Sequence, residues 1–185
     1  KAGCVDVLVP RCLIGNGQDV LRAPIDKEGL SSVQVEWSDG KIISIMGLTD
    51  TSEVPTEMLL PRFVEPHAHL DKAFSWSRSP NLKGGYKEAL SANLSEYQLR
   101  SKDDLLFRVE KSLNLALVNG IGAIRSHIDS FGETAMRDWD LLENVRTKWR
   151  DKIFLQFVAL VPLEFWQTSA GELLAQKVAS NGDLL

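Results

Sequence analysis

From about residue 59 to residue 180, the sequence alternates between apolar runs and segments with helical periodicity. This alternation requires a parallel sheet whose crossover connections are right-handed. It is compatible with an open sheet and with the first part of a (β/α)8 barrel, and periodicity alone does not distinguish them. The lack of a Gly-X-Gly-X-X-Gly motif and of a P-loop lysine argues against a nucleotide-binding open sheet. The predicted strands are residues 59–69, 121–129 and 153–161, and the predicted helices are residues 101–120, 133–150 and 172–180.

The first of these helices has clear signals at both ends. Ser101 is the predicted N-cap, and Asp103 and Asp104 follow it near the positive end of the helix dipole. Gly120 is the predicted C-terminal cap. One face of the helix is apolar and is predicted to pack on the sheet, and it consists of Leu105, Leu106, Val109, Leu113, Leu115, Ala116 and Leu117.

The helix at residues 133–150 and the strand after it also carry a core pattern. Residues 153–161 form a nearly continuous apolar run that Pro162 ends, as expected of a strand buried on both faces. The residues at helical spacing on the preceding helix are Trp139, Leu142, Val145 and Trp149.

Residues 1–56 have a different pattern and are predicted to form a small all-β unit. A tight-turn sequence at residues 38–41 joins two of its strands. The polar tract 49–55 ends in proline and is predicted to connect this unit to residues 57–185, the α/β part. The predicted strands of the first unit are residues 5–9, 33–37 and 42–46.

Two of the three histidines in the chain, His67 and His69, lie at the end of the first predicted strand of the α/β part. Because side chains alternate along a strand, both imidazoles are expected on one face, with Ala68 pointing away. Two imidazoles so placed can bind one metal ion, and zinc or iron(II) suits nitrogen ligands. Parallel sheets and barrels carry their chemistry at the carboxyl ends of their strands. A chance pair without metal is the alternative that the spacing leaves open.

The stretch between the histidines and the next helix, residues 74–97, has little regular pattern. Residues 87–93 alone are weakly helical. A long irregular segment directly after a metal-binding strand is a candidate lid over an active site. An ordinary surface loop is the alternative.

Composition argues against several classes of function. The 21 basic and 25 acidic residues give a net charge of −4, and the basic residues form no cluster, so neither nucleic acid nor an anionic membrane is an expected partner. No stretch has the length of a transmembrane helix, and the first residues lack a signal-peptide pattern. Cys4 and Cys12 lack the number and spacing of a zinc-binding cysteine site and are interpreted as reduced core or surface thiols. A cytoplasmic location is therefore predicted.

Two motifs resemble consecutive barrel strands of one known superfamily. Residues 60–72, Leu-Pro-Arg-Phe-Val-Glu-Pro-His-Ala-His-Leu-Asp-Lys, resemble the first barrel strand of the amidohydrolase superfamily and, within it, of the cytosine deaminase-like hydrolases. Residues 119–129, Asn-Gly-Ile-Gly-Ala-Ile-Arg-Ser-His-Ile-Asp, resemble the second strand of the same group. The resemblance implies a barrel: residues 57–185 would be about three βα units of a truncated (β/α)8 barrel. Residues 1–56 would be part of a small β-sandwich.

The resemblance also implies a chemistry. A divalent metal ion, zinc or iron, bound in part by His67 and His69 would lower the pKa of a water molecule. The resulting hydroxide would attack a small heterocyclic substrate that carries an amino group, and ammonia would leave with the help of an acid/base carboxylate. That carboxylate and the remaining metal ligands of such enzymes would lie beyond residue 185. The chain is therefore expected to be an N-terminal fragment, inactive alone, whose open strand edges need the missing C-terminal portion or a homo-oligomer partner.

Three more residues are candidates for binding substrate or for holding a metal-binding histidine in place. His127 and Asp129 alternate on the second strand and could face the barrel interior; a structural hydrogen bond is the alternative. Asp71 shares the face of the metal-binding pair if the first strand continues that far. Lys72 is expected to pair with Asp71, to reach the substrate or to lie exposed.

One departure from the cytosine-specific relatives concerns the substrate. Where that group has a glutamine after the proline that ends the third strand, this chain has Leu163 followed by Glu164. Leucine leaves the polar edge of cytosine unpaired, which favours a different amino-heterocycle or a cyclic amide. Two alternatives to a deaminase stay open: a cyclic amide hydrolase of the same superfamily, and a non-catalytic α/β binding domain whose histidines are incidental.

Overall fold

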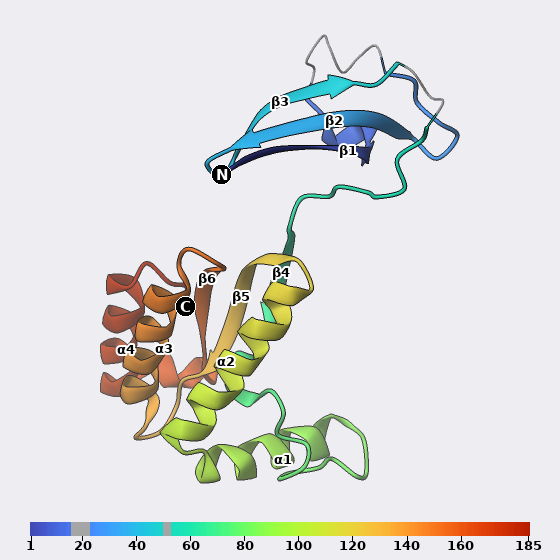
Figure 1. The fold of residues 1–185 in the computed structure, drawn as a ribbon. Helices are drawn as coiled ribbons and strands as arrows, with labels where there is room; N and C mark the ends of the chain where they lie inside the picture. Colours follow the sequence, from blue (N-terminus) through green and yellow to red (C-terminus); the bar gives the residue numbers. More distant parts are fainter. Residues whose placement is uncertain (16–22, 50–52) are drawn as a thin grey trace. The chain divides into compact units, whose positions relative to one another are not determined.

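The computed structural model describes residues 1–15, 23–49 and 53–185 of the chain. These residues form two units, Lys1–Pro61 and Arg62–Leu185, each with a three-stranded sheet (Figure 1). Residues 50–52 of the predicted connector lie outside the described ranges. No helix within those ranges combines the length and the apolar character that crossing a lipid bilayer requires.

The sheet of the first unit is antiparallel, and the three strands predicted there are confirmed. Between the last two strands, Asp39 and Gly40 have φ angles of 51° and 77°, the left-handed pair of a type I′ hairpin turn. Val33 is fully buried at the centre of this unit, beside Val7 and Val35. Cys4 and Cys12 are free, exposed thiols. The elements are β1 (Ala2–Pro10), the short 3-10 helix η1 (Arg11–Leu13), β2 (Leu30–Ser38) and β3 (Lys41–Gly47), with sheet order β1-β2-β3.

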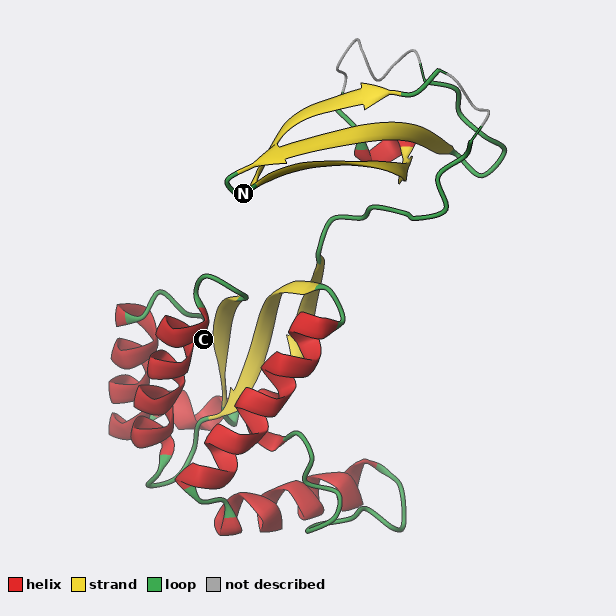
Figure 2. Ribbon diagram, viewed as in Figure 1, coloured by secondary structure: helices red, strands yellow, loops and turns green. Residues whose placement is uncertain are grey.

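The second unit has the predicted alternation of strands and helices, which confirms an α/β fold with parallel strands. Its sheet has the order β4-β5-β6, formed by Phe63–Ala68, Ile121–Asp129 and Phe154–Leu160. Three helices cover one face of the sheet (Figure 2): α2 (Lys102–Val118), α3 (Ala135–Trp149) and α4 (Ser169–Ser180). The remaining elements are the 3-10 helices η2 (Leu70–Lys72) and η3 (Leu163–Gln167) and the helix α1 (Tyr86–Leu99).

One hydrophobic core lies between these helices and the sheet. The apolar face predicted for α3 is confirmed, since all four of its residues are buried. The face predicted for α2 is right at Leu105, Val109 and Leu113 but wrong at Leu115, which is 47% exposed. Leu115 follows Leu113 by two residues and so points to nearly the opposite side of the helix. The strands and α4 contribute Ile124, Ile128, Leu155, Phe157, Ala159, Leu174 and Val178.

The ends of α2 are close to those predicted. Ser101 Oγ accepts a hydrogen bond from the N–H of Asp104 at 3.1 Å, and Asp104 Oδ2 accepts one from the N–H of Ser101 at 3.1 Å. This reciprocal pair is a capping box. Asn119 is the C-cap, and Gly120 follows it with a φ angle of 77°, which glycine adopts without a Cβ clash.

Replacing Ser101 with alanine is expected to lower the free energy of unfolding by about 1 kcal/mol, because the N–H of Asp104 loses its acceptor. Ser95→Ala is the matched control, since Ser95 is exposed within α1 and alanine has the higher helix propensity there. Urea unfolding followed by circular dichroism measures both variants. Equal losses of stability in the two would contradict the capping role.

Helix α1 corrects the expectation of a mostly irregular segment after the histidines. The predicted weak helix at residues 87–93 is in fact a regular helix of 14 residues. Gly84 and Gly85 precede it with φ angles of 69° and 80° and so turn the chain into the helix. The sequence signal was weak because glutamate and arginine, rather than apolar residues, are the buried side chains at its C-terminal end.

The first and third strands of the sheet also differ from the prediction. β4 ends at Ala68, because the next residues leave the ladder and the N–H of Leu70 donates to Ser126 Oγ at 3.0 Å. The expectation that the third strand is buried on both faces is wrong, since Phe154 is 67% exposed. Within the described ranges, helices cover only one face of this sheet, and Val64 and Phe154 on the other face are exposed.

The strand edge beside β6, predicted to be open, is in part paired. Leu184 forms a parallel bridge to Val158. The N–H of Ala159 donates to Leu184 O at 3.0 Å, and the N–H of Leu184 donates to Phe157 O at 3.1 Å. Leu184 therefore covers part of the edge of β6.

Candidate active site

A cavity of about 980 Å³ opens at the carboxyl ends of β4, β5 and β6. This end of a parallel sheet is where α/β proteins carry their functional sites. One wall is α1, and the opposite wall follows β6 into η3. The lining residues are His67, His69, Lys72, Tyr86, Leu90, Asn93, Leu94, His127, Asp129, Phe131, Leu160, Val161, Pro162 and Phe165.

All three histidines of the chain meet in this cavity. His67 Nε2 and His69 Nε2 are 3.3 Å apart. The rings of His67 and His127 stack with their centroids 4.0 Å apart. His69 Nδ1 lies 3.1 Å from the backbone oxygen of His127. A carbonyl oxygen only accepts hydrogen bonds, so Nδ1 of His69 carries the proton and its Nε2 presents a lone pair to the cavity.

The distance between the two Nε2 atoms fits a shared metal ion. Two nitrogens bound at about 2.0–2.1 Å to a tetrahedral ion are roughly 3.3–3.4 Å apart. A direct hydrogen bond between the two rings would give a similar separation. Within the described part of the chain, no group of three or more His, Cys, Asp or Glu side chains is arranged to hold a metal ion. His67 and His69 therefore fit two positions of a metal site and do not complete it.

The surroundings of His69 and His127 favour the neutral imidazole. Burial lowers the pKa of His69 below its ordinary value, and the nearby ammonium of Lys72 lowers it further. Burial, together with the neighbouring His67, also lowers the pKa of His127. A metal ion binds only the unprotonated nitrogen of an imidazole, so both effects favour the form that binds metal.

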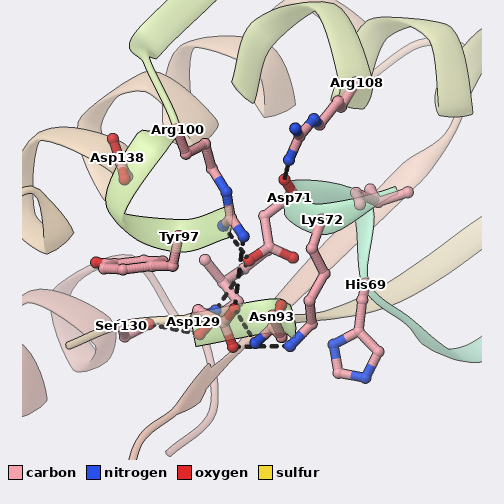
Figure 3. Close-up of polar contacts among 12 residues, drawn as sticks. His69, Asp71, Lys72, Asn93, Tyr97, Arg100, Arg108, Asp129, Ser130 and Asp138 are labelled. Carbon is pink, nitrogen blue, oxygen red and sulfur yellow. Dashed lines mark hydrogen bonds and ion pairs between the residues drawn. The ribbon is translucent and has the colours of Figure 1, made fainter. Parts of the chain in front are cut away.

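Close to His69 lies a group of buried charged side chains, here called the ion cluster (Figure 3). Arg100 is at its centre, with its side chain 3% exposed. Its Nη1 is 3.0 Å from Asp71 Oδ2, and its Nη2 is 3.7 Å from Asp129 Oδ2. The N–H of Asp129 donates to Asp71 Oδ2 at 3.1 Å. The ion cluster consists of Asp71, Lys72, Glu96, Arg100, Arg108 and Asp129.

Glu96 ties α1 and α2 to this ion cluster. Its Oε2 is 2.8 Å from Arg100 Nη2 and its Oε1 is 2.5 Å from Arg108 Nη2. Burial raises the pKa of Glu96, but the hydrogen bonds from the two guanidinium groups outweigh it, so the pKa lies below its ordinary value. Glu96 is therefore an ionised, paired carboxylate.

Asp71 lies in the ion cluster and not in the cavity. It belongs to η2, where the strand has already ended, so it does not share the face of the histidine pair. Burial raises its pKa to about 6, and the neighbouring Asp129 also raises it. Its contacts with Arg100 and with the N–H of Asp129 are those of a residue that joins β4 to β5.

The structure brings only part of the predicted site together. His67, His69, His127 and Asp129 all line the cavity. Leu163 is 78% exposed and Glu164 is exposed on η3, and neither lines the cavity. In their place, Phe165 and Pro162 contribute that wall, because the 3-10 turn carries the two intervening side chains outward.

Several residues of the site were not predicted from the sequence. Asn93 and the apolar side chains of α1 line the cavity, and Glu96, Arg100 and Arg108 form half of the ion cluster. One signal was present: Arg108 lies next to Val109 within the apolar face of α2, and a charged residue on a buried face requires a buried partner. That partner is Glu96 of α1, a contact between helices that the sequence does not identify.

The sequence of the chain is similar to that of a known deaminase. No family model matches the chain. Over 148 residues it is 35% identical to a pterin deaminase of Rhizobium rhizogenes (strain K84 / ATCC BAA-868), and the match covers 75% of this chain and 33% of that protein. The predicted resemblance to amidohydrolase-type deaminases is confirmed. The chain spans about a third of the length of this curated relative.

Two solved structures of larger enzymes share the fold of the chain. A 5-methylcytosine deaminase from Klebsiella pneumoniae has a TM-score of 0.63 and 22% sequence identity, covering 81% of this chain and 38% of that one. An N-isopropylammelide isopropylaminohydrolase from Burkholderia multivorans ATCC 17616 has a TM-score of 0.57 and 23% identity, covering 97% of this chain and 44% of that one. At these identities the likeness establishes the fold alone.

Proposed function

We propose that this chain is part of a metal-dependent hydrolase that removes ammonia from an amino-substituted nitrogen heterocycle. The observation that carries the proposal is the pair of imidazole nitrogens, 3.3 Å apart, in a cavity at the carboxyl ends of parallel strands. The similarity to a pterin deaminase supports the same reaction class. The largely apolar cavity suits a flat, neutral ring.

His67 and His69 would hold the metal, zinc or iron, through their Nε2 atoms. When bound, such an ion supplies the activation of water by lowering its pKa toward neutrality. The backbone oxygen of His127 orients the ring of His69, and the stacked ring of His127 supports His67. The other metal ligands and the acid/base carboxylate would come from residues outside the described part of this chain.

The proposed fold of the complete protein is a (β/α)8 barrel, with residues 57–185 as its first βα units and residues 1–56 as part of a β-sandwich. The face of the sheet opposite the helices supports this: Val64 is 68% exposed and Phe154 is 67% exposed. In a closed barrel that face becomes the packed interior. The additional strands would come from the rest of a longer polypeptide or from a second copy.

Ammonia release by the complete protein tests the proposed reaction. Pterins, aminopyrimidines and aminotriazines are incubated with the metal-loaded protein, and ammonia and the oxo product are quantified. We expect one ammonia per oxo product for at least one ring class, and loss of turnover after chelation. A ring-opened acid without ammonia would instead indicate a cyclic amide hydrolase. Absence of both bound metal and turnover would refute the hydrolase function.

A further inference from the structure

Lys72 lies between the histidine pair and the ion cluster. Its Nζ is 2.8 Å from Asp129 Oδ1, and its side chain is 19% exposed while that of Asp129 is 2% exposed. Figure 3 shows the lysine extending beside the ring of His69 toward Asp129. Of the alternatives left open for Lys72, a pair with Asp71 is therefore not formed; Asp71 Oδ2 contacts Arg100 instead.

Lys72 and Asn93 form a polar corner in a cavity with otherwise mostly apolar walls. Asn93 Nδ2 donates to the second oxygen of Asp129 at 3.2 Å. An ammonium group has three N–H donors, and within the described ranges Asp129 is its one hydrogen-bond acceptor. Lys72 therefore retains donors for a ligand on the cavity side. Leu90, Leu94, Phe131, Leu160, Val161 and Phe165 supply the apolar walls.

The charge balance of the ion cluster indicates what such a ligand is. Three carboxylates, of Asp71, Glu96 and Asp129, face three cations, of Lys72, Arg100 and Arg108. The formal charge of the group is zero, so it offers no excess positive charge to an anion. A polarised neutral acceptor, such as a ring carbonyl oxygen, matches a lysine that is already paired.

We propose that Lys72 determines specificity by donating a hydrogen bond to a ring carbonyl oxygen of the substrate. Amino-heterocycles that also carry an oxo group should then bind more tightly than rings with the amino group alone. This inference rests on the proposed function for the reacting group, but the recognition of the oxo group is a separate property. Asp129 acts through Lys72 as a positioning residue.

Matched ligand pairs test the proposal in the complete, metal-loaded protein. Pterin is compared with 2-aminopteridine, and cytosine with 4-aminopyrimidine, by calorimetric binding and by ammonia release. We expect the wild type to bind the oxo member of at least one pair about 10- to 100-fold more tightly, since a hydrogen bond from a charged donor is lost in the other member. In Lys72→Met this preference disappears through a weaker affinity for the oxo member alone.

Two further variants separate recognition from structure. Lys72→Arg keeps a charged donor and the pair with Asp129, and we expect it to retain the oxo preference. Lys102→Met, at an exposed lysine of α2, is the control and should leave both affinities unchanged. An equal loss of affinity for both members of a pair in Lys72→Met would overturn the proposal. So would equal affinity for both members in the wild type, a measurement that needs no variant to fold.

The readouts also separate this inference from the proposed reaction. Oxo-selective binding that depends on Lys72, without ammonia release from any ligand, would support the inference and refute the deaminase. Ammonia release from both members of a pair at equal kcat/KM would support the deaminase and refute the recognition of the oxo group by Lys72. Absence of binding and of turnover for every ligand would refute both.

Discussion

Replacing His67 and His69 together with alanine is expected to reduce bound metal from about one ion per chain to none. Both Nε2 atoms that fit the ion are lost, and the described part of the chain has no group of three or more His, Cys, Asp or Glu side chains arranged to hold one. Ammonia release by the complete protein should fall by more than about 100-fold. Removing a residue that only hydrogen-bonds to a metal ligand typically costs up to about 100-fold, and removing the ligands themselves should cost more. Elemental analysis by mass spectrometry and an ammonia assay give the two readouts.

His127→Ala is the matched comparison, because it removes the third imidazole of the same cavity. His127 stacks on His67 but contributes only its backbone oxygen to His69. We expect this variant to keep its metal, with weaker affinity. Retention of a full complement of metal by the double variant would show that the histidine pair is incidental.

Replacing Arg100 with methionine should lower the free energy of unfolding by about 3–5 kcal/mol, because it leaves buried carboxylates without their cation. Arg100 is 3% exposed and contacts Asp71 and Glu96 at 3.0 Å and 2.8 Å. Denaturant unfolding measures the change. Removal of a partner exposes the full desolvation cost of the carboxylates, so the loss exceeds the net contribution of the pairs themselves.

Arg150→Met controls for the loss of an arginine as such. Arg150 is 73% exposed, and its nearest carboxylate, that of Asp151, is 3.8 Å away and 90% exposed. Exposed pairs of this kind contribute less than about 1 kcal/mol. A loss at Arg100 no larger than that at Arg150 would contradict the view that the ion cluster supports the fold.

The sequence predicted the features that depend on local pattern. Alternating apolar runs and helical periodicity identified the parallel strands, and Ser101 with Asp104 identified the start of α2. The histidine pair was predicted to lie on one side, and the two Nε2 atoms are adjacent. Each of these features is determined by residues within a few positions of one another.

The residues that the sequence did not predict depend on contacts between distant segments. Arg100 pairs with Asp71 across 29 positions, and Lys72 pairs with Asp129 across 57. No periodicity encodes which of several carboxylates a given cation contacts. Glu164, in contrast, was predicted from the sequence to lie in the site but does not line the cavity. The 3-10 turn after Pro162 places Phe165 there instead.

The two ends of α1 differ in burial and in contacts: the C-terminal end is buried and paired, and the start is exposed beside the cavity. Its C-terminal end is held by Glu96 in the ion cluster, while Tyr86 and Leu90 near its start are 81% and 44% exposed and line the cavity. Substitutions near the start of the helix would therefore change which rings fit while leaving the folded state intact. Natural variation could diversify the substrate range of such enzymes through one helical turn, without compensating changes elsewhere.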